Sequence, residues 1–255
     1  MTDNNKDINA ATVKDAKASN NKLSELNNID NLSHYLKSAA GTREGRAIPP
    51  LENWHPEQID DMDLVIKANG EWWHEGGHMT RESLVSLFAT ILWKEEKDGV
   101  TEYFLKTPLQ KLRIQVEDAP LLINDVGIVN EDTNSWLEFT TTTGDVVRLD
   151  DKHPIILRPY DVVNSFIKDN GDENENDCSI DTDAPHNNQS VADKHSAADV
   201  QIRPYMLVRN GLTALIGRNV FYHLTEIGEL TEQDGKTTLT LQSGGSTYTL
   251  SMPSI

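Results

Sequence analysis

The feature of this sequence that most constrains its fold is an order of predicted elements that occurs twice: strands, one long helix, an Asp-Gly turn, and strands again. Asp98-Gly99 and Asp234-Gly235 mark the corresponding turns after the two predicted helices. Asp-Gly pairs favour tight hairpin turns, in which both central residues adopt positive φ. The sequence therefore predicts an α+β fold of two similar modules, as a duplication would give, each a mostly antiparallel sheet with one long helix.

Apolar periodicity places the individual elements. The two predicted helices carry apolar residues mostly three and four apart, at Leu84, Leu87, Phe88, Ile91 and Leu92, and at Leu212, Leu215, Ile216, Val220, Leu224 and Ile227. Strands are predicted over residues 64–68, 71–74, 103–106, 112–116, 123–129, 136–141, 146–149, 238–241 and 247–250. Asn69-Gly70, Gly144-Asp145 and Gly244-Gly245 are predicted turns between strands.

Composition divides the chain into three parts. Residues 1–48 are predicted to be a polar tail with one short amphipathic helix, whose apolar positions are Leu23, Leu26, Ile29, Leu32 and Leu36. Residues 49–120 form the N-terminal α+β module and residues 121–255 the C-terminal one. Residues 168–200 are an acidic insertion that has too few apolar residues to form a core.

The charge and the cysteine count exclude several classes of protein. There are 41 Asp and Glu residues against 23 Lys and Arg, a net charge of −18, which argues against duplex nucleic acid or an anionic membrane as a partner. The single cysteine, Cys178, excludes an internal disulfide and a cysteine-based zinc cluster. With no apolar run of about 20 residues and no signal-peptide pattern, we expect a cytoplasmic protein that does not insert into membranes.

Residues 74–78, His-Glu-Gly-Gly-His, match the zinc-protease pattern H-E-x-x-H. That chemistry needs both histidines on one face of a helix. Gly76 and Gly77 disfavour a helix by about 1 kcal/mol each, and Thr80 is the predicted N-cap of the helix that follows. We therefore place the motif in the connection between strand and helix and expect no bound metal and no cofactor. A zinc hydrolase using His74, Glu75 and His78 stays a minor alternative.

A glycine-rich loop that enters a helix is also a suitable anion site, because free backbone N–H groups and the positive end of the helix dipole lie there. Arg81 in the first helical turn would favour an anion, unless Glu82 balances its charge. Trp72 and Trp73 offer a stacking surface, although at least one of them is expected in the core.

The sequence also resembles a bacterial family, domain-of-unknown-function family 1285 (DUF1285), over about residues 50–255. The matching pieces are Trp54-x-Pro56, Gly70-x-Trp72, Arg81, Asp98-Gly99, Tyr103-Phe104-Leu105, Thr107-Pro108, Ile114-x-Val116-Glu117-Asp118-Ala119-Pro120, Pro204-Tyr205, Val208-Arg209-x-Gly211-Leu212, Arg218 and Tyr222. The resemblance implies a duplicated core, a C-terminal module like a pleckstrin-homology fold and no established enzyme activity. It also implies a ligand pocket between the modules, for a nucleotide-like molecule in signalling. The acidic insertion departs from the compact family pattern.

An anionic ligand would need cations, which are scarce in this chain. The predicted helical spacing places Arg218 on one face with Gly211, Ala214 and Tyr222. The alternative is that Arg209 or Arg218 pairs with Glu117 or Asp118. The complete predicted ligand site is Trp72, His74, Gly76, Gly77, Arg81, Lys106, Pro204, Tyr205, Arg209, Arg218 and Tyr222.

These observations favour a non-catalytic regulatory protein that binds a small anionic molecule. The sequence contains no nucleophile elbow, P-loop or dinucleotide fingerprint. Glu117 and Asp118 are neighbours in a predicted strand, so their side chains face opposite ways and cannot act as one acid–base pair. A protein–protein adaptor without a small ligand is the second hypothesis.

Overall fold

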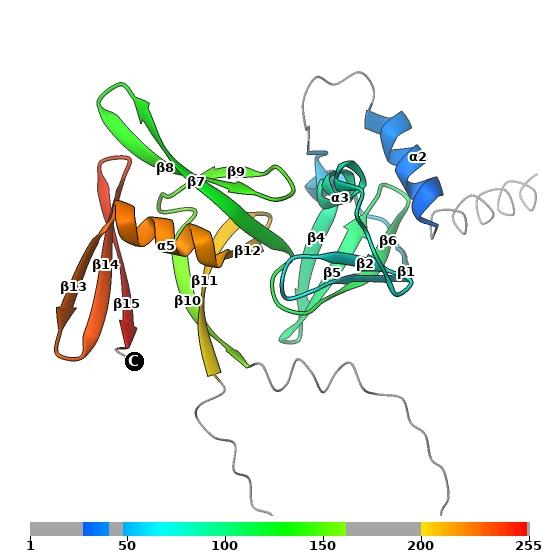
Figure 1. Cartoon of the computed structure of the whole chain (residues 1–255). Helices are drawn as coiled ribbons and strands as arrows, with labels where there is room; N and C mark the ends of the chain where they lie inside the picture. The colour runs from blue at the N-terminus through cyan, green and yellow to red at the C-terminus, as the bar shows by residue number, and fades with distance from the viewer. Residues whose placement is uncertain (1–27, 41–47, 162–199, 254–255) are drawn as a thin grey trace, which may run out of the picture. The chain divides into compact units, whose positions relative to one another are not determined.

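The computed structural model describes residues 28–40, 48–161 and 200–253 (Figure 1). The predictions for residues 1–20, Leu23, Leu26, Cys178 and nearly all of the acidic insertion lie outside these residues. The chain divides into a larger unit, Met1–Ile156 with Pro204–Ile255, and a smaller one, Leu157–Arg203. In the smaller unit, the described residues are the far ends of two strands, where the Arg203 guanidinium lies 3.5 Å from the centre of the Tyr160 ring.

A six-stranded mixed sheet occupies the N-terminal part of the larger unit. Its strands lie in the order β3-β2-β1-β6-β5-β4, and β1 and β6 are parallel. The bounds are β1 Gln58–Ile66, β2 Trp72–His74, β3 Gly77–His78, β4 Leu92–Lys97, β5 Val100–Lys106 and β6 Gln110–Val116. Helix α3 (Glu82–Ala89) connects β3 to β4; helix α2 (Ile29–Ala40) and the 3₁₀ turn η2 (Leu51–Asn53) precede β1.

The two faces of this sheet differ because the strand residues alternate. Met62, Leu64 and Ile66 of β1 are buried, as are Leu84 and Phe88 of α3. The other face carries aromatic and charged side chains. The register aligns Trp93, Phe104 and Arg113 in one row across β4, β5 and β6, and Lys106 with Lys111 in the next row.

A second six-stranded mixed sheet has the order β10-β11-β12-β7-β8-β9, and β12 runs parallel to β7. Its strands are β7 Leu121–Glu131, β8 Asn134–Thr141, β9 Val146–Arg148, β10 Ile155–Asp161, β11 Val200–Arg209 and β12 Leu212–Ile216. Helix α5 (Arg218–Ile227) follows β12. A three-stranded antiparallel sheet closes the described chain, with β13 Glu229–Gln233, β14 Lys236–Ser243 and β15 Ser246–Pro253.

The α+β class is therefore confirmed, as two six-stranded mixed sheets, a small three-stranded sheet and three helices in the described residues. The predicted turns at Asp98-Gly99, Asp234-Gly235 and Gly244-Gly245 are also confirmed, and both central residues of each have positive φ. The predicted N-terminal helix exists as α2, whose buried residues include Leu32 and Leu36.

Both predicted long helices are wrong at one end. The first ends at Ala89, so Ile91 and Leu92 lie outside it. Thr90 is its C-cap residue, and the Thr90 hydroxyl donates to the Leu87 carbonyl oxygen at 2.7 Å. The second begins only at Arg218, because Leu212–Ile216 is strand β12. In β12 the buried residues alternate with half-buried ones, so the true period is two, which resembles helical spacing over so few residues.

Candidate functional site

The His-Glu-Gly-Gly-His motif is a β-hairpin. Strand β2 ends at His74, Glu75 and Gly76 turn with φ of 48° and 70°, and β3 begins at Gly77. The register pairs Trp73 with His78 and His74 with Gly77. Because neighbouring strand residues point to opposite faces, His74 and His78 lie on opposite sides of the hairpin. The prediction that this motif is not helical is confirmed; strand β3 was not predicted.

The hairpin side chains are engaged with the protein. His74 Nδ1 donates a hydrogen bond of 2.6 Å to the Asp63 carbonyl oxygen. The rings of Trp73 and His78 stack with centroids 5.5 Å apart, and Trp72 is buried. In the chain as described, no group of three or more His, Cys, Asp or Glu side chains is placed to hold a metal ion.

The start of α3 differs from the prediction. Its N-cap is Arg81, whose side chain makes no capping bond, and not Thr80. The carbonyl oxygen of Arg81 accepts the backbone N–H groups of Leu84 and Val85 at 2.9 and 3.2 Å. Arg81 has the extended backbone of a cap residue and is exposed, so it precedes the first turn in which the sequence placed it.

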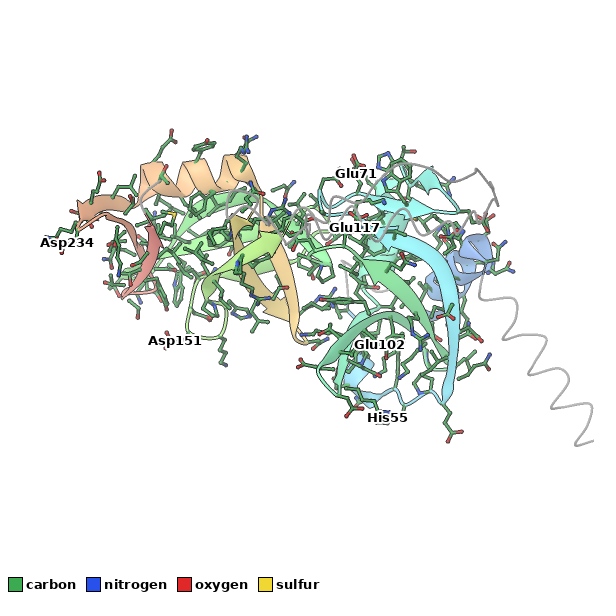
Figure 2. The ribbon with its side chains drawn as sticks, turned by 90° about the horizontal axis from the view of Figure 1, so that it is seen from below. His55, Glu71, Glu102, Glu117, Asp151 and Asp234 are labelled. Atoms are coloured by element: carbon green, nitrogen blue, oxygen red, sulfur yellow. The ribbon has the colours of Figure 1, made fainter. Side chains whose placement is uncertain are left out.

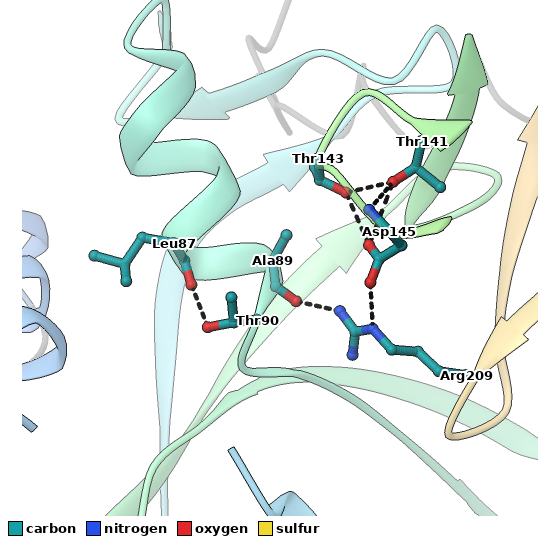
Figure 3. Close-up of polar contacts among 7 residues, drawn as sticks. All are labelled: Leu87, Ala89, Thr90, Thr141, Thr143, Asp145 and Arg209. Carbon is teal, nitrogen blue, oxygen red and sulfur yellow. Dashed lines mark hydrogen bonds and ion pairs between the residues drawn. The ribbon is translucent and has the colours of Figure 1, made fainter. Parts of the chain in front are cut away.

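The cation with the most specific surroundings is Arg209, the last residue of β11 (Figure 3). Its Nε donates to Asp145 Oδ1 at 2.8 Å, and its Nη2 donates to the Ala89 carbonyl oxygen at 2.5 Å. Ala89 is the last residue of α3, where carbonyl groups lack helical partners and attract a cation. Arg209 thus links the C-terminus of α3 to the turn between β8 and β9.

Asp145 is nearly inaccessible and is held by its own turn. Its Oδ2 accepts hydrogen bonds from the hydroxyls of Thr141 and Thr143 at 3.3 and 3.2 Å. Its backbone N–H donates to Thr141 Oγ1 at 2.8 Å. The side chains of Asp145 and Arg209 are 3% and 13% exposed, so this is a buried ion pair with a fixed carboxylate.

The third nitrogen of Arg209 is unsatisfied. Over the described residues, Nη1 is the one buried side-chain nitrogen or oxygen that has no hydrogen-bond partner. A guanidinium has five N–H donors and no acceptor, and an unpaired buried donor costs about 1–3 kcal/mol. An oxygen atom from outside the chain would complete this group.

Three more contacts are made by residues 117–122, which connect β6 to β7 and begin β7. The Tyr205 hydroxyl, also from β11, donates to Asp118 Oδ1 at 2.6 Å. Gly70 lies so close to Leu122 that a Cβ atom on it would meet Leu122 Cδ2 at 2.8 Å. Glu117 (labelled in Figure 2) forms an ion pair of 2.7 Å with Lys67. The predicted pairing of Arg209 with Glu117 or Asp118 is therefore wrong, and Asp145 takes that role.

Lys106, the last residue of β5, is only 4% exposed. Its Nζ lies 3.7 Å from the centre of the Trp93 ring. Burial lowers the pKa of the Lys106 amine; Glu95 opposes this shift, Lys111 adds to it, and Glu52 opposes it. The sequence had proposed Lys106 as a ligand residue without its aromatic neighbour.

The remaining predicted residues lie elsewhere. Arg218 is the first residue of α5 and is exposed, as is Tyr222 one turn later. The predicted helical face that joins Arg218 to Gly211 and Ala214 is wrong, because Gly211 is in a turn and Ala214 in β12. Pro204 lies in β11 beside Tyr205. The structure thus brings Tyr205 and Arg209 onto one strand, whereas Arg218 lies at the start of α5.

Sequence reasoning missed Asp145 and Trp93 as partners of the two buried cations. Asp145 does carry a local signal: Thr141-Thr142-Thr143-Gly144-Asp145 places hydroxyls two and four residues before a carboxylate at a tight turn. Such residues hydrogen-bond to nearby backbone and side chains. Trp93 gave no signal, because its contact with Lys106 depends on the pairing of β4 with β5.

Residues 49–119 match the domain of unknown function (DUF1285), N-terminal domain, and residues 177–250 match the protein of unknown function (DUF1285), C-terminal domain. The protein belongs to the DUF1285 family and has both of its domains. No curated protein matches it.

Two solved structures are similar. A DUF1285 family protein from Silicibacter pomeroyi DSS-3 is 28% identical, with a TM-score of 0.55, over 84% of this chain and 93% of the other. One from Shewanella baltica OS155 is 25% identical, with a TM-score of 0.39, over 64% and 91%. Among the described helices, none has the length and apolar character that a membrane span requires.

Proposed function

We propose that this protein is a non-catalytic binding protein with a regulatory role, and that it takes an anionic, nucleotide-like small molecule beside Arg209. The observation that carries the proposal is the buried Nη1 atom without a hydrogen-bond partner. Asp145 and the Ala89 carbonyl fix the other two nitrogens. A phosphate or carboxylate oxygen in the guanidinium plane would therefore meet a donor that is already oriented.

The charge balance indicates where the rest of the ligand would lie. Asp145 already neutralises Arg209, so an anion needs another cation. Lys94 is a suitable one, because a Cβ atom on Gly211, two residues after Arg209, would lie 3.9 Å from Lys94 Cδ. Lys94 Nζ lies 3.7 Å from Glu96 Oε2, which makes a weak ion pair between partly exposed side chains. A phosphate group would replace Glu96 as the partner of Lys94. The signalling role rests on the family resemblance alone.

A thermal-shift screen tests this function. Purified protein is heated with nucleoside mono-, di- and triphosphates, cyclic nucleotides and inorganic phosphate, each at several concentrations. A ligand at a hundred times its dissociation constant stabilises the folded state by about 2.7 kcal/mol. The proposal expects at least one phosphate-containing compound to raise the melting temperature in a saturable way. A screen in which neutral nucleosides act as well as nucleotides would contradict the anionic ligand.

The second candidate, a protein adaptor, has one observation in its favour. Strand β13 is an edge strand of the three-stranded sheet, and all five of its residues are exposed, including Leu230 at 49%. Edge strands can accept an extended peptide by backbone pairing. The two-residue turn at Asp234-Gly235 makes Thr231 a hydrogen-bonded partner of Thr238, so the N–H of Glu232 faces the open edge. Glu232→Pro would block such pairing, and loss of binding to an extended peptide in this variant alone would favour the adaptor.

The finer fold assignment is also part of the proposal. The resemblance suggests that the two domains arose by duplication and that the C-terminal one, residues 121–255, has a pleckstrin-homology-like fold. The strand, helix, turn and strand order supports this view. One difference weighs against a simple repeat: α3 connects two strands of one sheet, whereas α5 connects β12 of the second sheet to β13 of the third.

A further inference from the structure

Lys106 differs in its hydrogen bonding from Lys111 and Arg113, the two cations on the neighbouring strand β6. Lys111 Nζ donates to both oxygens of Glu95, at 2.9 and 2.7 Å, and Arg113 pairs with Asp61 and Glu102. The Lys106 ammonium donates no hydrogen bond to any residue that the structure describes, and its contact is the Trp93 ring. Lys106, which is only 4% exposed, thus uses none of its hydrogen-bonding capacity within the described chain.

The neighbouring groups explain why no acceptor reaches Lys106. Glu95 is the nearest candidate, but its Oε1 also accepts the Trp93 indole N–H at 3.1 Å, and Lys111 occupies both oxygens. The Lys106 nitrogen is not completely enclosed, since Arg209 Nη1 is the one fully buried, unbonded nitrogen in the described residues.

These surroundings are those of an activated amine. Lysines become nucleophiles when they are desolvated or lie beside a second cation, because both conditions favour the neutral amine. Lys106 meets both conditions, through its burial and through Lys111 in the same row of the sheet. Burial is the largest cause that lowers its pKa, and it outweighs Glu95 and Glu52.

We propose that Lys106 is a covalent attachment site for a small carbonyl compound, an aldehyde or ketone, which it binds as a protonated imine. The amine nitrogen attacks the carbonyl carbon to form a carbinolamine, and the carbonyl oxygen then leaves as water. Overall, R–NH₃⁺ and O=CR′₂ give R–NH⁺=CR′₂ and H₂O, so one C=O bond is replaced by one C=N bond with no change in charge. This site is separate from the one at Arg209 and does not depend on it.

Two features of the site select the ligand. The iminium product keeps the positive charge, so the Trp93 ring that now faces the ammonium at 3.7 Å would also stabilise the product. Two ammonium groups, Lys106 and Lys111, are already balanced by Glu95 and Glu52. An additional negative charge has no free partner here, so a neutral carbonyl compound fits better than a keto acid.

Reductive trapping tests this proposal. The full-length protein is incubated at neutral pH with propanal and sodium cyanoborohydride, which converts any imine to a stable secondary amine. Mass spectrometry of peptides then gives the labelling rate at each lysine. We expect Lys106 to label several-fold faster than the exposed Lys152 and Lys236, and faster with propanal than with glyoxylate.

Variants of Lys111 provide the decisive comparison. Lys111→Gln removes the second cation and frees Glu95 to stabilise the Lys106 ammonium, so labelling of Lys106 should fall several-fold while Lys152 is unchanged. Lys111→Arg keeps the charge and the ion pair and should preserve the rate. Circular dichroism confirms that both variants are folded. Labelling of Lys106 no faster than that of Lys152, or a rate that Lys111→Gln leaves unaltered, would overturn the proposal.

Discussion

Arg209 and Lys106 are both cations withdrawn from solvent, but they are held in opposite ways. Arg209 has a buried carboxylate partner, a helix C-terminal carbonyl and one free nitrogen. Lys106 has an aromatic ring and no hydrogen bond within the described chain. Arg209 is therefore fixed in position and suited to orient a ligand, whereas Lys106 keeps an available lone pair once it loses its proton. The groups that neutralise each buried cation therefore determine whether it can orient a ligand or react with one.

The largest expected effect comes from breaking the Arg209 pair. Arg209→Met leaves Asp145 buried without its cation and should lower the free energy of unfolding by about 3–5 kcal/mol. Chemical denaturation at neutral pH measures this loss. The double variant Arg209→Met with Asp145→Leu removes both charges and should recover much of it. A single variant as stable as the wild type would show that the pair is not buried.

A pair of glycine variants tests the close contact between Gly70 and Leu122. Gly70→Ala should destabilise by about 2–4 kcal/mol, because it combines overpacking against Leu122 with a positive φ of 86°. Gly76→Ala is the matched control: its φ is 70° but nothing lies within 4 Å of the added Cβ. It should cost only about 1 kcal/mol, from backbone strain alone. Equal losses would mean that Gly70 and Leu122 are not in close contact.

Lys106→Met sharpens the contrast with Arg209→Met. It removes a cation–π contact of about 0.5–2 kcal/mol but also removes the cost of burying an ammonium. We expect the free energy of unfolding to change by less than about 1 kcal/mol. Thermal and urea unfolding of the two methionine variants side by side give the answer. A loss as large as that of Arg209→Met would indicate a hydrogen-bonded ion pair at Lys106.

The smallest effect is a pH dependence at Glu95. Burial alone would raise the pKa of the Glu95 carboxyl, but the hydrogen bonds and charge of Lys111, with the Trp93 N–H, hold it below its ordinary value. A lowered folded-state pKa gives stability that is present above the unfolded pKa and is lost as the pH falls through the folded one. Because Glu95 is 38% exposed, Glu95→Gln should cost only about 0.5–1 kcal/mol at pH 7.

Unfolding curves of the wild type and Glu95→Gln from pH 7 down to pH 3 check this sign. The stability difference between them should shrink steadily as Glu95 of the wild type becomes protonated. A difference that grows in acid would mean that the carboxylate is destabilised in the folded state. Glu57→Gln is a suitable control, because Glu57 is exposed and precedes β1.

The elements that sequence reasoning predicted well are those specified by short-range chemistry. The turns at Asp98-Gly99, Asp234-Gly235 and Gly244-Gly245 need positive φ at both central residues, and the residue types show it. Strands with strict alternation, such as β6, were also predicted correctly. Strand β12 was predicted wrongly as part of the helix. The spacing of Leu212, Leu215 and Ile216 is compatible with a helix, and β12 is followed closely by α5.

The site was less predictable because it depends on long-range pairing. Arg209 and Tyr205 were proposed from the sequence, but Asp145 and Ala89 reach Arg209 from 64 and 120 residues away. No local pattern reports such a partner. Arg218 was proposed from a helical face that does not exist, since the helix begins at Arg218 itself.

The most direct test of the account is a calorimetric titration of the best phosphate-containing compound from the screen into the wild type and into Arg209→Lys. A lysine can keep the ion pair with Asp145 but has no equivalent of Nη1. We predict that Arg209→Lys stays folded and loses at least about tenfold in affinity, equivalent to 1.4 kcal/mol, while the control Arg218→Gln binds like the wild type. Unchanged affinity in Arg209→Lys, or loss in Arg218→Gln alone, would contradict a ligand site at Arg209.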